Sequence, residues 1–163
     1  MQQTYPQAGV SIALFRGGEV LLVERGKGLY KGAWSLPGGA VELGETAREA
    51  AARELLEETG LLALNLTLSD VADAILRGPD GAVETHYMIA VFACERFSGT
   101  LKPGGDAPDA RWFAVEAVPG LEGTPGLEEV IGKAKEALAK GMRCSGAREK
   151  LHMRRLPRSS PPA

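Results

Sequence analysis

The feature that most constrains the fold is a group of three carboxylates at helical spacing. Glu54, Glu57 and Glu58 stand at positions i, i+3 and i+4, and on a helix these offsets place side chains on one face, with Cβ atoms about 6 Å apart. Like charges so placed repel one another. A hard divalent cation reverses this balance, because Mg²⁺ and Ca²⁺ bind converging oxygen ligands at roughly 2.0–2.6 Å. The spacing therefore predicts a helix that carries a metal site, and the alternative is an ordinary charged, solvated helical face.

The sequence also predicts where this helix begins and ends. Thr46 and Glu49 fit the S/T-x-x-E capping box, in which each side chain accepts a hydrogen bond from the other residue's backbone N–H. Gly60 suits the left-handed position that follows a helix. We therefore expect a helix from about residue 47 to residue 59. Its core-facing side should hold the apolar residues that point away from the carboxylates, namely Ala51, Ala52, Leu55 and Leu56.

Two neighbouring features support a ligand site rather than a solvated face. Arg53 stands about one turn from both Glu49 and Glu57, so it can pair with either and hold a carboxylate in orientation. Upstream, the Pro-Gly-Gly sequence at residues 37–39 predicts a permissive loop whose main-chain carbonyls can approach a ligand. The loop, the arginine and the three carboxylates together favour the metal site.

The stretch from residue 39 to residue 61 fits the pattern G-x5-E-x7-R-E-U-x-E-E-x-G-U, where U is a bulky aliphatic residue. The residues at its fixed positions are Gly39, Glu45, Arg53, Glu54, Leu55, Glu57, Glu58, Gly60 and Leu61. On this motif the chain resembles the Nudix hydrolases. The similarity extends to RGKGLYKGAWSLPGGAVELGE at residues 25–45 and to DARWFAVEAVP at residues 109–119, and it covers most of residues 8–140.

The resemblance implies hydrolysis of the pyrophosphate bond in a nucleoside diphosphate linked to another moiety, with Mg²⁺ or Mn²⁺ as cofactor. The chain looks most like the compact bacterial ADP-ribose pyrophosphatases, so the expected substrate is ADP-ribose or a similar nucleotide sugar. The alternative is a MutT-like housecleaning enzyme that cleaves nucleoside triphosphates. A non-catalytic nucleotide-sensing module and an RNA-associated enzyme are weaker alternatives. Related enzymes often form homodimers, which the resemblance carries over as an expectation.

The resemblance also assigns roles within the motif. Glu54, Glu57 and Glu58 are the expected metal ligands, and the Gly39 carbonyl is the expected fourth contact. Arg53 completes the expected catalytic set by orienting these ligands. Either Glu54 or Glu58 can also accept a proton from the attacking water.

Residues outside the helix extend the expected site toward the substrate. Arg25 and Lys27 lie in a basic loop that contains glycine, and we expect them to bind a substrate phosphate beside Gly38 and Gly39. For Arg25 and Lys27, the alternative is surface charge at the end of a hairpin.

Three acids outside the helix are candidates for the general base or a further ligand. Asp106 matches where such an acid often falls in related enzymes, but ordinary turn chemistry in a Gly/Pro-rich loop explains it equally well. The turn explanation is favoured for Asp109, and Glu95 is the weakest candidate. Glu45, which precedes the helix, is expected either to cap it or to join the outer shell of the metal.

Apolar periodicity and turn residues predict the other elements. We expect a hairpin of strands at 10–15 and 19–24, a short strand at 34–36, one or two strands within 61–76, a turn at 79–81, a strand at 85–95, a strand at 110–115 and a helix at 127–140. The strand at 85–95 is apolar on both faces, which predicts a central, covered strand. The helix at 127–140 should bury Val130, Ile131, Ala134 and Leu138. This order predicts a mixed sheet flanked by helices, in agreement with the α/β/α sandwich that the resemblance implies.

The bulk properties set the remaining bounds. With 163 residues the chain has room for one domain, expected at 1–141, followed by a basic and flexible tail at 142–163. A net charge of −2 gives no global field for nucleic acid or anionic membrane, and a small-molecule nucleotide is the expected partner. No apolar run reaches 18 residues and no signal pattern opens the chain, so a cytoplasmic location is expected. Cys94 and Cys144 show no zinc-ligand spacing with the two histidines.

Overall fold

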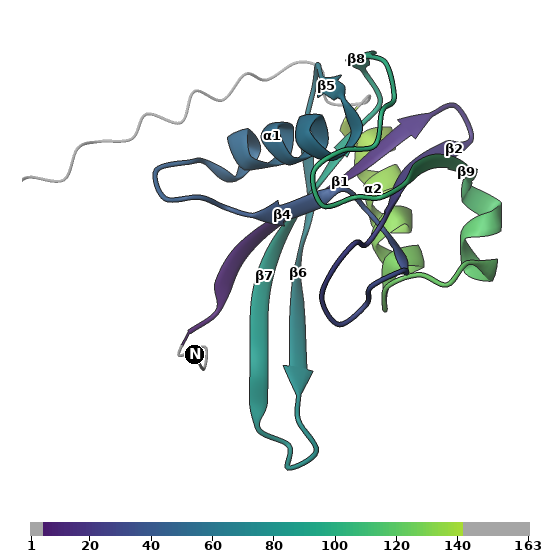
Figure 1. Cartoon of the computed structure of the whole chain (residues 1–163). Coiled ribbons are helices and arrows are strands. Elements are labelled where there is room, and N and C mark those ends of the chain that lie inside the picture. The colour runs from purple at the N-terminus through teal and green to yellow at the C-terminus, as the bar shows by residue number, and fades with distance from the viewer. Residues whose placement is uncertain (1–4, 142–163) are drawn as a thin grey trace, which may run out of the picture.

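The computed structural model describes residues 5–141, which form a mixed β-sheet with helices on both faces (Figure 1). The elements are β1 (Gln7–Arg16), β2 (Glu19–Glu24), β3 (Trp34–Ser35), β4 (Gly38–Ala40), α1 (Ala47–Thr59), β5 (Leu61–Ala63), β6 (Thr67–Arg77), β7 (Val83–Cys94), β8 (Phe97–Gly99), β9 (Ala110–Ala114), the 3₁₀ helix η1 (Val115–Gly120) and α2 (Leu127–Gly141). This is the predicted α/β/α sandwich. The predicted tail at 142–163, including Cys144, lies outside the described residues. No helix within 5–141 has both the length and the apolar character needed to cross a membrane.

The sheet places the glycine loop beside its central strand. The strand order is β3-β2-β1-β7-β6, with β4 also paired to β1 and β9 to β2, and a separate small sheet joins β5 to β8. Strands β1 and β2 form the predicted hairpin, with Phe15 opposite Val20. Strand β1 runs parallel to β7 and antiparallel to β4, where Val10 lies opposite Gly39. The backbone of the predicted ligand loop is therefore fixed to the middle of the sheet.

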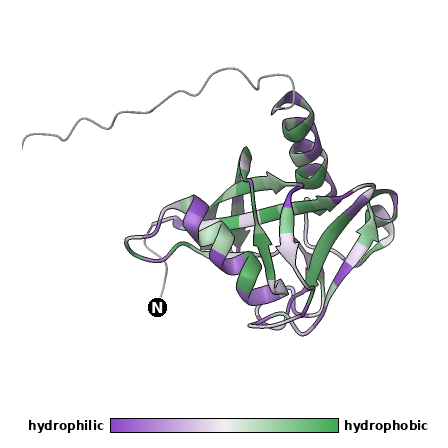
Figure 2. Cartoon of the chain, turned by 90° about the horizontal axis from the view of Figure 1, so that it is seen from above, coloured by the Kyte–Doolittle hydropathy of each residue, from purple (hydrophilic) through white to green (hydrophobic). Residues whose placement is uncertain are grey.

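Alternate residues of β1 enter two different hydrophobic clusters, one on each face of the sheet. Val10, Ile12 and Leu14 pack in the cluster beneath α1, whereas Ala13 and Phe15 pack in the cluster beneath α2. Figure 2 shows the apolar strands lying between the two helices. Because both faces are covered, this part of the sheet is a rigid base for the loops at its edges.

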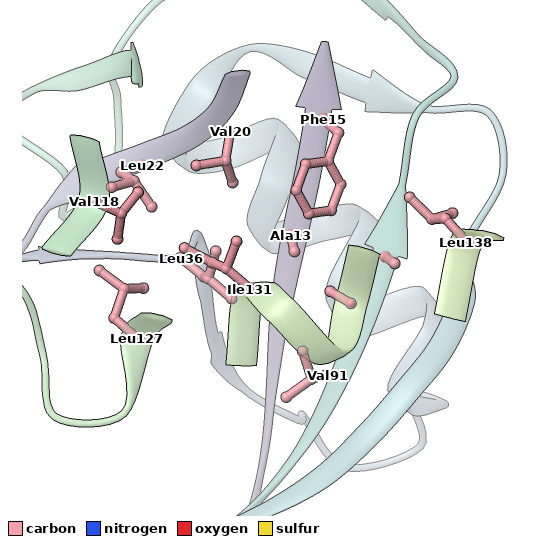
Figure 3. Packing of buried hydrophobic residues seen from close by; sticks show 12 residues of the cluster. Ala13, Phe15, Val20, Leu22, Leu36, Val91, Val118, Leu127, Ile131 and Leu138 are labelled. Carbon is pink, nitrogen blue, oxygen red and sulfur yellow. The ribbon is translucent and has the colours of Figure 1, made fainter. Parts of the chain in front are cut away.

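Helix α2 covers the second face much as the sequence predicts. Ile131, Ala134 and Leu138 are buried, and Figure 3 shows Ile131 pointing into the cluster that contains Phe15 and Val91. Val130, predicted to face inward, is only partly buried, and Leu127 takes its place in the core. The buried positions are spaced by four, three and four residues, which is one stripe of a helix, and Val130 lies at the border of that stripe.

Strand β7 differs from its prediction along two thirds of its length. Val91 to Cys94 are buried, as expected for a covered strand, but residues 83–90 are partly or fully exposed. The reason is that β6 and β7 continue as a long hairpin beyond the two helices (Figure 1). Met88 and Ile75 on this hairpin are 48% and 46% exposed. The predicted turn at 79–81 lies at the tip, where the Gly81 N–H donates to the Gly78 carbonyl.

Candidate active site

Helix α1 has the predicted ends because local hydrogen bonds determine both of them. The Glu49 N–H donates to Thr46 Oγ1 (3.2 Å), and the Thr46 N–H donates to Glu49 Oε2 (2.8 Å), so both bonds of the capping box are present. At the other end Gly60 has a φ of 71° and its N–H donates to the Leu56 carbonyl. The helix therefore runs from residue 47 to residue 59, as predicted.

The core-facing side of α1 is rotated relative to the prediction. The residues that it buries are Ala50, Ala51, Leu55 and Thr59. Leu56 is 43% exposed and Ala52 is only partly buried, so the prediction was wrong for Leu56. The buried row follows i, i+4 and i+8 from Ala51 to Thr59, and the Thr59 hydroxyl is accommodated because it donates to the Leu55 carbonyl (2.5 Å). This rotation leaves the acidic positions of the helix partly open to solvent.

Two of the three predicted carboxylates converge on the glycine loop. The Gly38 N–H donates to Glu58 Oε2 (2.9 Å). A Cβ atom placed on Gly39 would lie 2.3 Å from Glu54 Oε1, so the Glu54 carboxylate rests directly against the loop backbone. The absence of a side chain at Gly39 is what permits this approach. The loop therefore holds two anionic side chains close together.

The electrostatic consequence appears at Glu58. The pKa of the Glu58 carboxyl is raised to about 7, chiefly by burial and also by the Glu54 carboxylate, while the Gly38 N–H and Arg25 act in the opposite direction. A buried acid beside a second acid is stabilised by a nearby positive charge. These two residues thus have the character of cation ligands.

Arg53 connects the helix to the loop in front of it. Its Nε and Nη2 donate to Glu45 Oε1 (2.8 Å) and Oε2 (3.0 Å), its Nη1 donates to Glu54 Oε1 (2.8 Å), and its Nη2 also donates to the Ala40 carbonyl (3.0 Å). These acceptors raise the pKa of Arg53. The predicted partner Glu49 is instead occupied by the capping box. Glu45 does not cap α1. Both of its carboxylate oxygens accept hydrogen bonds from Arg53, so it is the bidentate partner of that residue.

Glu57 lies apart from the other two carboxylates. Its side chain is 54% exposed, and Glu57 Oε2 lies 3.5 Å from Arg53 Nη1. Within residues 5–141, no three His, Cys, Asp or Glu side chains are gathered closely enough to hold a metal ion. The donor set nevertheless fits a hard dication, since Glu54, Glu58 and the Gly39 backbone adjoin one another and Glu57 follows on the same helical face.

Arg25 lies close to these acids at the end of β2. Its backbone closes the β2–β3 loop, because the Arg25 N–H donates to the Ala33 carbonyl (3.0 Å) and the Gly32 N–H donates to the Arg25 carbonyl (2.8 Å). The Nε atom of Arg25 is buried and makes no hydrogen bond within the described residues. Its charge lowers the pKa of Glu58, which places the guanidinium within electrostatic reach of that carboxylate. A buried guanidinium N–H without an acceptor suits an anionic ligand.

Lys27 and Asp106 form an ion pair between the β2–β3 loop and the segment before β9. The pair joins Lys27 Nζ to Asp106 Oδ2, and their side chains are 75% and 63% exposed. Asp106 also contributes to the raised pKa of Glu58, so it lies within electrostatic reach of the motif. Asp106 is therefore near the predicted site, with its carboxylate held by Lys27.

The other two acidic candidates lie in structural positions. Asp109 Oδ1 accepts from the Ala110 N–H (2.8 Å), and Asp109 Oδ2 pairs with Arg111 Nη2 (2.5 Å). This is the turn role that the sequence favoured. Glu95 is exposed just beyond the end of β7. Among the described residues, neither side chain shares a hydrogen-bonding or ion-pair partner with Glu54, Glu57 or Glu58.

The sequence did not reveal that residues 100–109 connect α1 to the β2–β3 loop. Residues 100–109 cross the end of α1, where the Lys102 N–H donates to the Thr59 carbonyl (2.9 Å) and the Gly104 N–H donates to the Glu58 carbonyl (3.1 Å). The same segment then accepts a hydrogen bond from the Gly26 N–H at the Asp106 carbonyl (3.1 Å). Its glycines were the available signal, since loops that approach another backbone closely often need them.

Comparisons with known proteins agree with this geometry. The family model described as NUDIX domain matches residues 5–133. The ADP-ribose pyrophosphatase of Methanocaldococcus jannaschii is 37% identical over 117 residues, which are 72% of this chain and 67% of that protein. The crystal structure of a MutT NUDIX hydrolase from Burkholderia pseudomallei has a TM-score of 0.71 and 28% identity, and covers 79% of this chain and 98% of its own. The NUDIX domain of Shewanella oneidensis NrtR, crystallised with ADP ribose, has a TM-score of 0.71 at 20% identity, covering 83% and 90%. At that identity, the last match supports the fold alone.

Fold and motif together define a phosphoanhydride-cleaving enzyme of the α/β/α class. The chain belongs to the Nudix hydrolase family, whose members act on pyrophosphate bonds and generally need a divalent metal. The predicted family and fold are thereby confirmed.

Proposed function

We propose that the protein hydrolyses the pyrophosphate bond of ADP-ribose or a similar nucleotide sugar, with Mg²⁺ or Mn²⁺ as cofactor. The observation that carries this proposal is the arrangement around the glycine loop. Glu54 and Glu58 lie against Gly38 and Gly39, and the guanidinium of Arg25, whose Nε is buried, lies within electrostatic reach of Glu58. Two carboxylates that could bind a metal ion therefore lie within reach of an arginine that could bind a phosphate. The choice of ADP-ribose rests on the relative from Methanocaldococcus jannaschii.

The residues that would hold the metal are Glu54, Glu57 and Glu58 together with the Gly39 carbonyl. For Glu57 this requires its side chain to turn from Arg53 toward the other two acids, which its exposure permits. A bound dication neutralises phosphate charge and lowers the pKa of a coordinated water. Arg53 contributes by fixing the Glu54 carboxylate against the loop through Glu45 and Ala40.

The reaction itself is an in-line attack of water on phosphorus. The water oxygen forms a bond to one phosphorus of the pyrophosphate, and the bond from that phosphorus to the bridging oxygen breaks. With ADP-ribose the products are AMP and ribose 5-phosphate. Arg25 and Lys27 bind the phosphate oxygens and so orient the diphosphate for this attack.

The proton released by water passes to a carboxylate at the site. We propose Glu58 for this role, with Oε1 as the accepting oxygen, because Oε2 already accepts the Gly38 N–H. Asp106 is the alternative acceptor outside the helix, and it would have to part from Lys27 to act. Replacing each by its amide and comparing kcat separates the two: the true base loses far more kcat than the other residue.

Several broader features complete the proposal. The catalytic unit is a single domain at residues 1–141, the substrate is a small-molecule nucleotide, and the location is cytoplasmic. A homodimer is proposed because related enzymes often form one. The exposed apolar side chains of the β6–β7 hairpin provide a surface for its interface. Neither membrane nor nucleic acid is a proposed partner.

The decisive variant is Glu57→Gln, which removes a ligand charge and almost no volume. We expect Mg²⁺-dependent hydrolysis to fall by more than the roughly 10- to 100-fold that outer-shell changes cause, with an unchanged melting temperature in EDTA. Glu136→Gln, which makes the same change on the exposed side of α2, is the control. Equal turnover by Glu57→Gln and the parent would refute the site.

The substrate is tested with a panel of ADP-ribose, other nucleotide sugars, dinucleoside polyphosphates and nucleoside triphosphates, with the phosphate products identified. The highest kcat/KM is expected for ADP-ribose or another nucleotide sugar. A preference for nucleoside triphosphates with release of pyrophosphate would favour the MutT-like alternative. Binding without turnover for every compound would favour a nucleotide-sensing module.

A further inference from the structure

A pocket of about 460 Å³ lies between the β2–β3 loop and the segment before β9. The side chains that line it are Glu24, Arg25, Lys27, Lys31, Asp106 and Pro108, and glycines complete its wall. Three of these six side chains are cations and two are carboxylates. Such a pocket is polar and has a positive balance.

The lining indicates which half of a nucleotide sugar the pocket can take. A nucleobase is usually held by aromatic or aliphatic surfaces on which its ring stacks. Here Pro108 is the one apolar side chain in the lining, and no aromatic residue is present. A phosphorylated sugar instead needs cations for its phosphate and polar groups for its hydroxyls, and Arg25, Lys27 and Lys31 provide the cations.

The charged side chains of the pocket interact electrostatically with the carboxylates of α1. Glu54 and Glu58 both contribute to a raised pKa of Lys27, although its ion pair with Asp106 is the larger cause. Arg25 and Asp106, which also line the pocket, act on Glu58. A phosphate bound at Arg25 and Lys27 would therefore lie within electrostatic reach of Glu54 and Glu58, and the attached sugar could extend toward Lys31 in the same lining.

Of the two carboxylates in the lining, Glu24 and Asp106, it is Asp106 that opposes an anionic ligand at Lys27. Its carboxylate occupies Lys27, and both side chains are mostly exposed, so the pair is weak enough to be exchanged for a phosphate. The backbone around it is fixed, because the Gly26 N–H donates to the Asp106 carbonyl and a Cβ on Gly26 would lie 2.2 Å from that oxygen. Ligand binding can thus change the side-chain pairing without moving the loops.

We propose that this pocket binds the sugar-phosphate half of the substrate and that Asp106 is the counter-ion that Lys27 gives up when the phosphate binds. The proposal rests on the proposed function, and it adds to it the orientation of the substrate and the role of two residues, Lys31 and Asp106. Asp106 is here a positioning residue that sets the affinity of the pocket.

Binding to the resting enzyme tests the proposal without turnover. NMR titrations in EDTA would compare ribose 5-phosphate with AMP for the parent, Lys31→Gln and Asp106→Asn. We expect Lys31→Gln to weaken ribose 5-phosphate binding about two- to fivefold and Asp106→Asn to strengthen it by a similar factor, as expected for exposed charge pairs. AMP affinity should change less than about twofold in Lys31→Gln. Lys140→Gln and Glu136→Gln, an exposed pair on α2 that does not line the pocket, provide matched changes of charge.

Three outcomes would overturn the assignment. Equal or larger effects of Lys31→Gln on AMP would place the adenosine half in the pocket, and unchanged or weaker ribose 5-phosphate binding by Asp106→Asn would remove the counter-ion role. No binding of ribose 5-phosphate to the parent would exclude the subsite. Kinetics add a separate check, because a counter-ion role lowers KM for ADP-ribose in Asp106→Asn whereas loss of a general base lowers kcat. If the binding results hold but ADP-ribose is not hydrolysed, the proposed function fails and the sugar-phosphate pocket stands.

Discussion

At the scale of single residues, the two adjacent glycines of the ligand loop have different neighbours and should respond differently to substitution. A Cβ at Gly39 meets Glu54 Oε1 at 2.3 Å, which is the far end of a flexible side chain. A Cβ at Gly38 meets the Val10 carbonyl oxygen at 2.1 Å, which is backbone of the central strand. We therefore expect Gly39→Ala to fold and to lose activity as Glu54 is displaced, and Gly38→Ala to lose stability by about 1–3 kcal/mol.

Thermal unfolding and kcat/KM measured on the same samples check this prediction. Gly18→Ala is the control, because a Cβ there meets no atom within 4 Å. A Gly39→Ala variant with full activity would show that Glu54 does not need its position against the loop. Equal destabilisation by both loop variants would show that the Glu54 side chain cannot move aside.

Glu58 gives a pH dependence whose sign follows from its pKa. The folded protein without metal has a Glu58 pKa of about 7, above the ordinary value of 4.5, so it binds this proton more tightly than the unfolded chain does. The contribution to stability is complete below pH 4.5 and is lost as the pH rises to about 7. In EDTA, Glu58→Gln should therefore raise the free energy of unfolding at pH 8 by roughly 1–3 kcal/mol and have little effect near pH 4.

Urea unfolding at the two pH values measures the effect. Unfolding in the presence of added Mg²⁺ is the complementary test of Glu58 as a ligand. The parent should gain stability from millimolar Mg²⁺ at pH 8, whereas Glu58→Gln should gain less because a ligand charge is gone. A variant that is less stable than the parent at pH 8 in EDTA would contradict the raised pKa.

The residues that meet at the glycine loop could be predicted from the sequence, but the hydrogen-bond partners of Arg53 could not. Glu54, Glu58 and Arg53 follow from spacing within one helix, where geometry is regular. The partner of Arg53 was wrongly expected to include Glu49, because the capping box occupies that side chain and Glu45 is brought within reach by the loop before the helix. A long side chain that reaches across a loop depends on a backbone path that the sequence does not specify locally.

At the scale of elements, the predictions are accurate where contacts within the segment determine its structure, and less accurate where distant contacts do. Helix α1 has both predicted ends because its caps are formed by residues within the segment. The same holds for the β1–β2 hairpin with its two glycines. Strand β7 was predicted as covered throughout, and this failed because coverage depends on where α1 and α2 end, which is a property of the packed molecule.

The connection between the β2–β3 loop and residues 100–109 allows a prediction at this scale. A methyl group at Gly26 would meet the Asp106 carbonyl oxygen at 2.2 Å, so Gly26→Ala must push two backbone segments apart. We expect a loss of about 1–3 kcal/mol in stability and a rise in KM, because the wall of the pocket is displaced. Chemical unfolding and steady-state kinetics, with Gly18→Ala as the control, measure both effects. Unchanged KM in a destabilised variant would separate the loop contact from substrate binding.

At the scale of the whole molecule, the sheet explains how distant segments meet in one site. Strand β1 fixes the glycine loop through β4, β2 leads into the Arg25 loop, and β9 anchors the segment that carries Asp106. Each segment is held by a strand that is buried on both faces, or by a strand paired to such a strand. Groups of the candidate site can therefore lie on loops while their positions stay defined.

The last prediction concerns how much of the chain this arrangement needs. Helix α2 ends at Gly141 with Leu138 as its last buried residue, and the family match ends at residue 133. Removal of residues 142–163, which include six basic residues and one acid, should leave the melting temperature and the kcat/KM for ADP-ribose unchanged. RNA affinity measured at two salt concentrations gives the contrasting readout, because an enzyme that uses a basic tail to hold RNA would lose affinity and salt dependence on truncation. A fall in both RNA affinity and turnover would assign the enzyme to RNA ends, whereas intact small-molecule turnover with negligible RNA binding by the full chain fits a nucleotide-sugar hydrolase contained within residues 1–141.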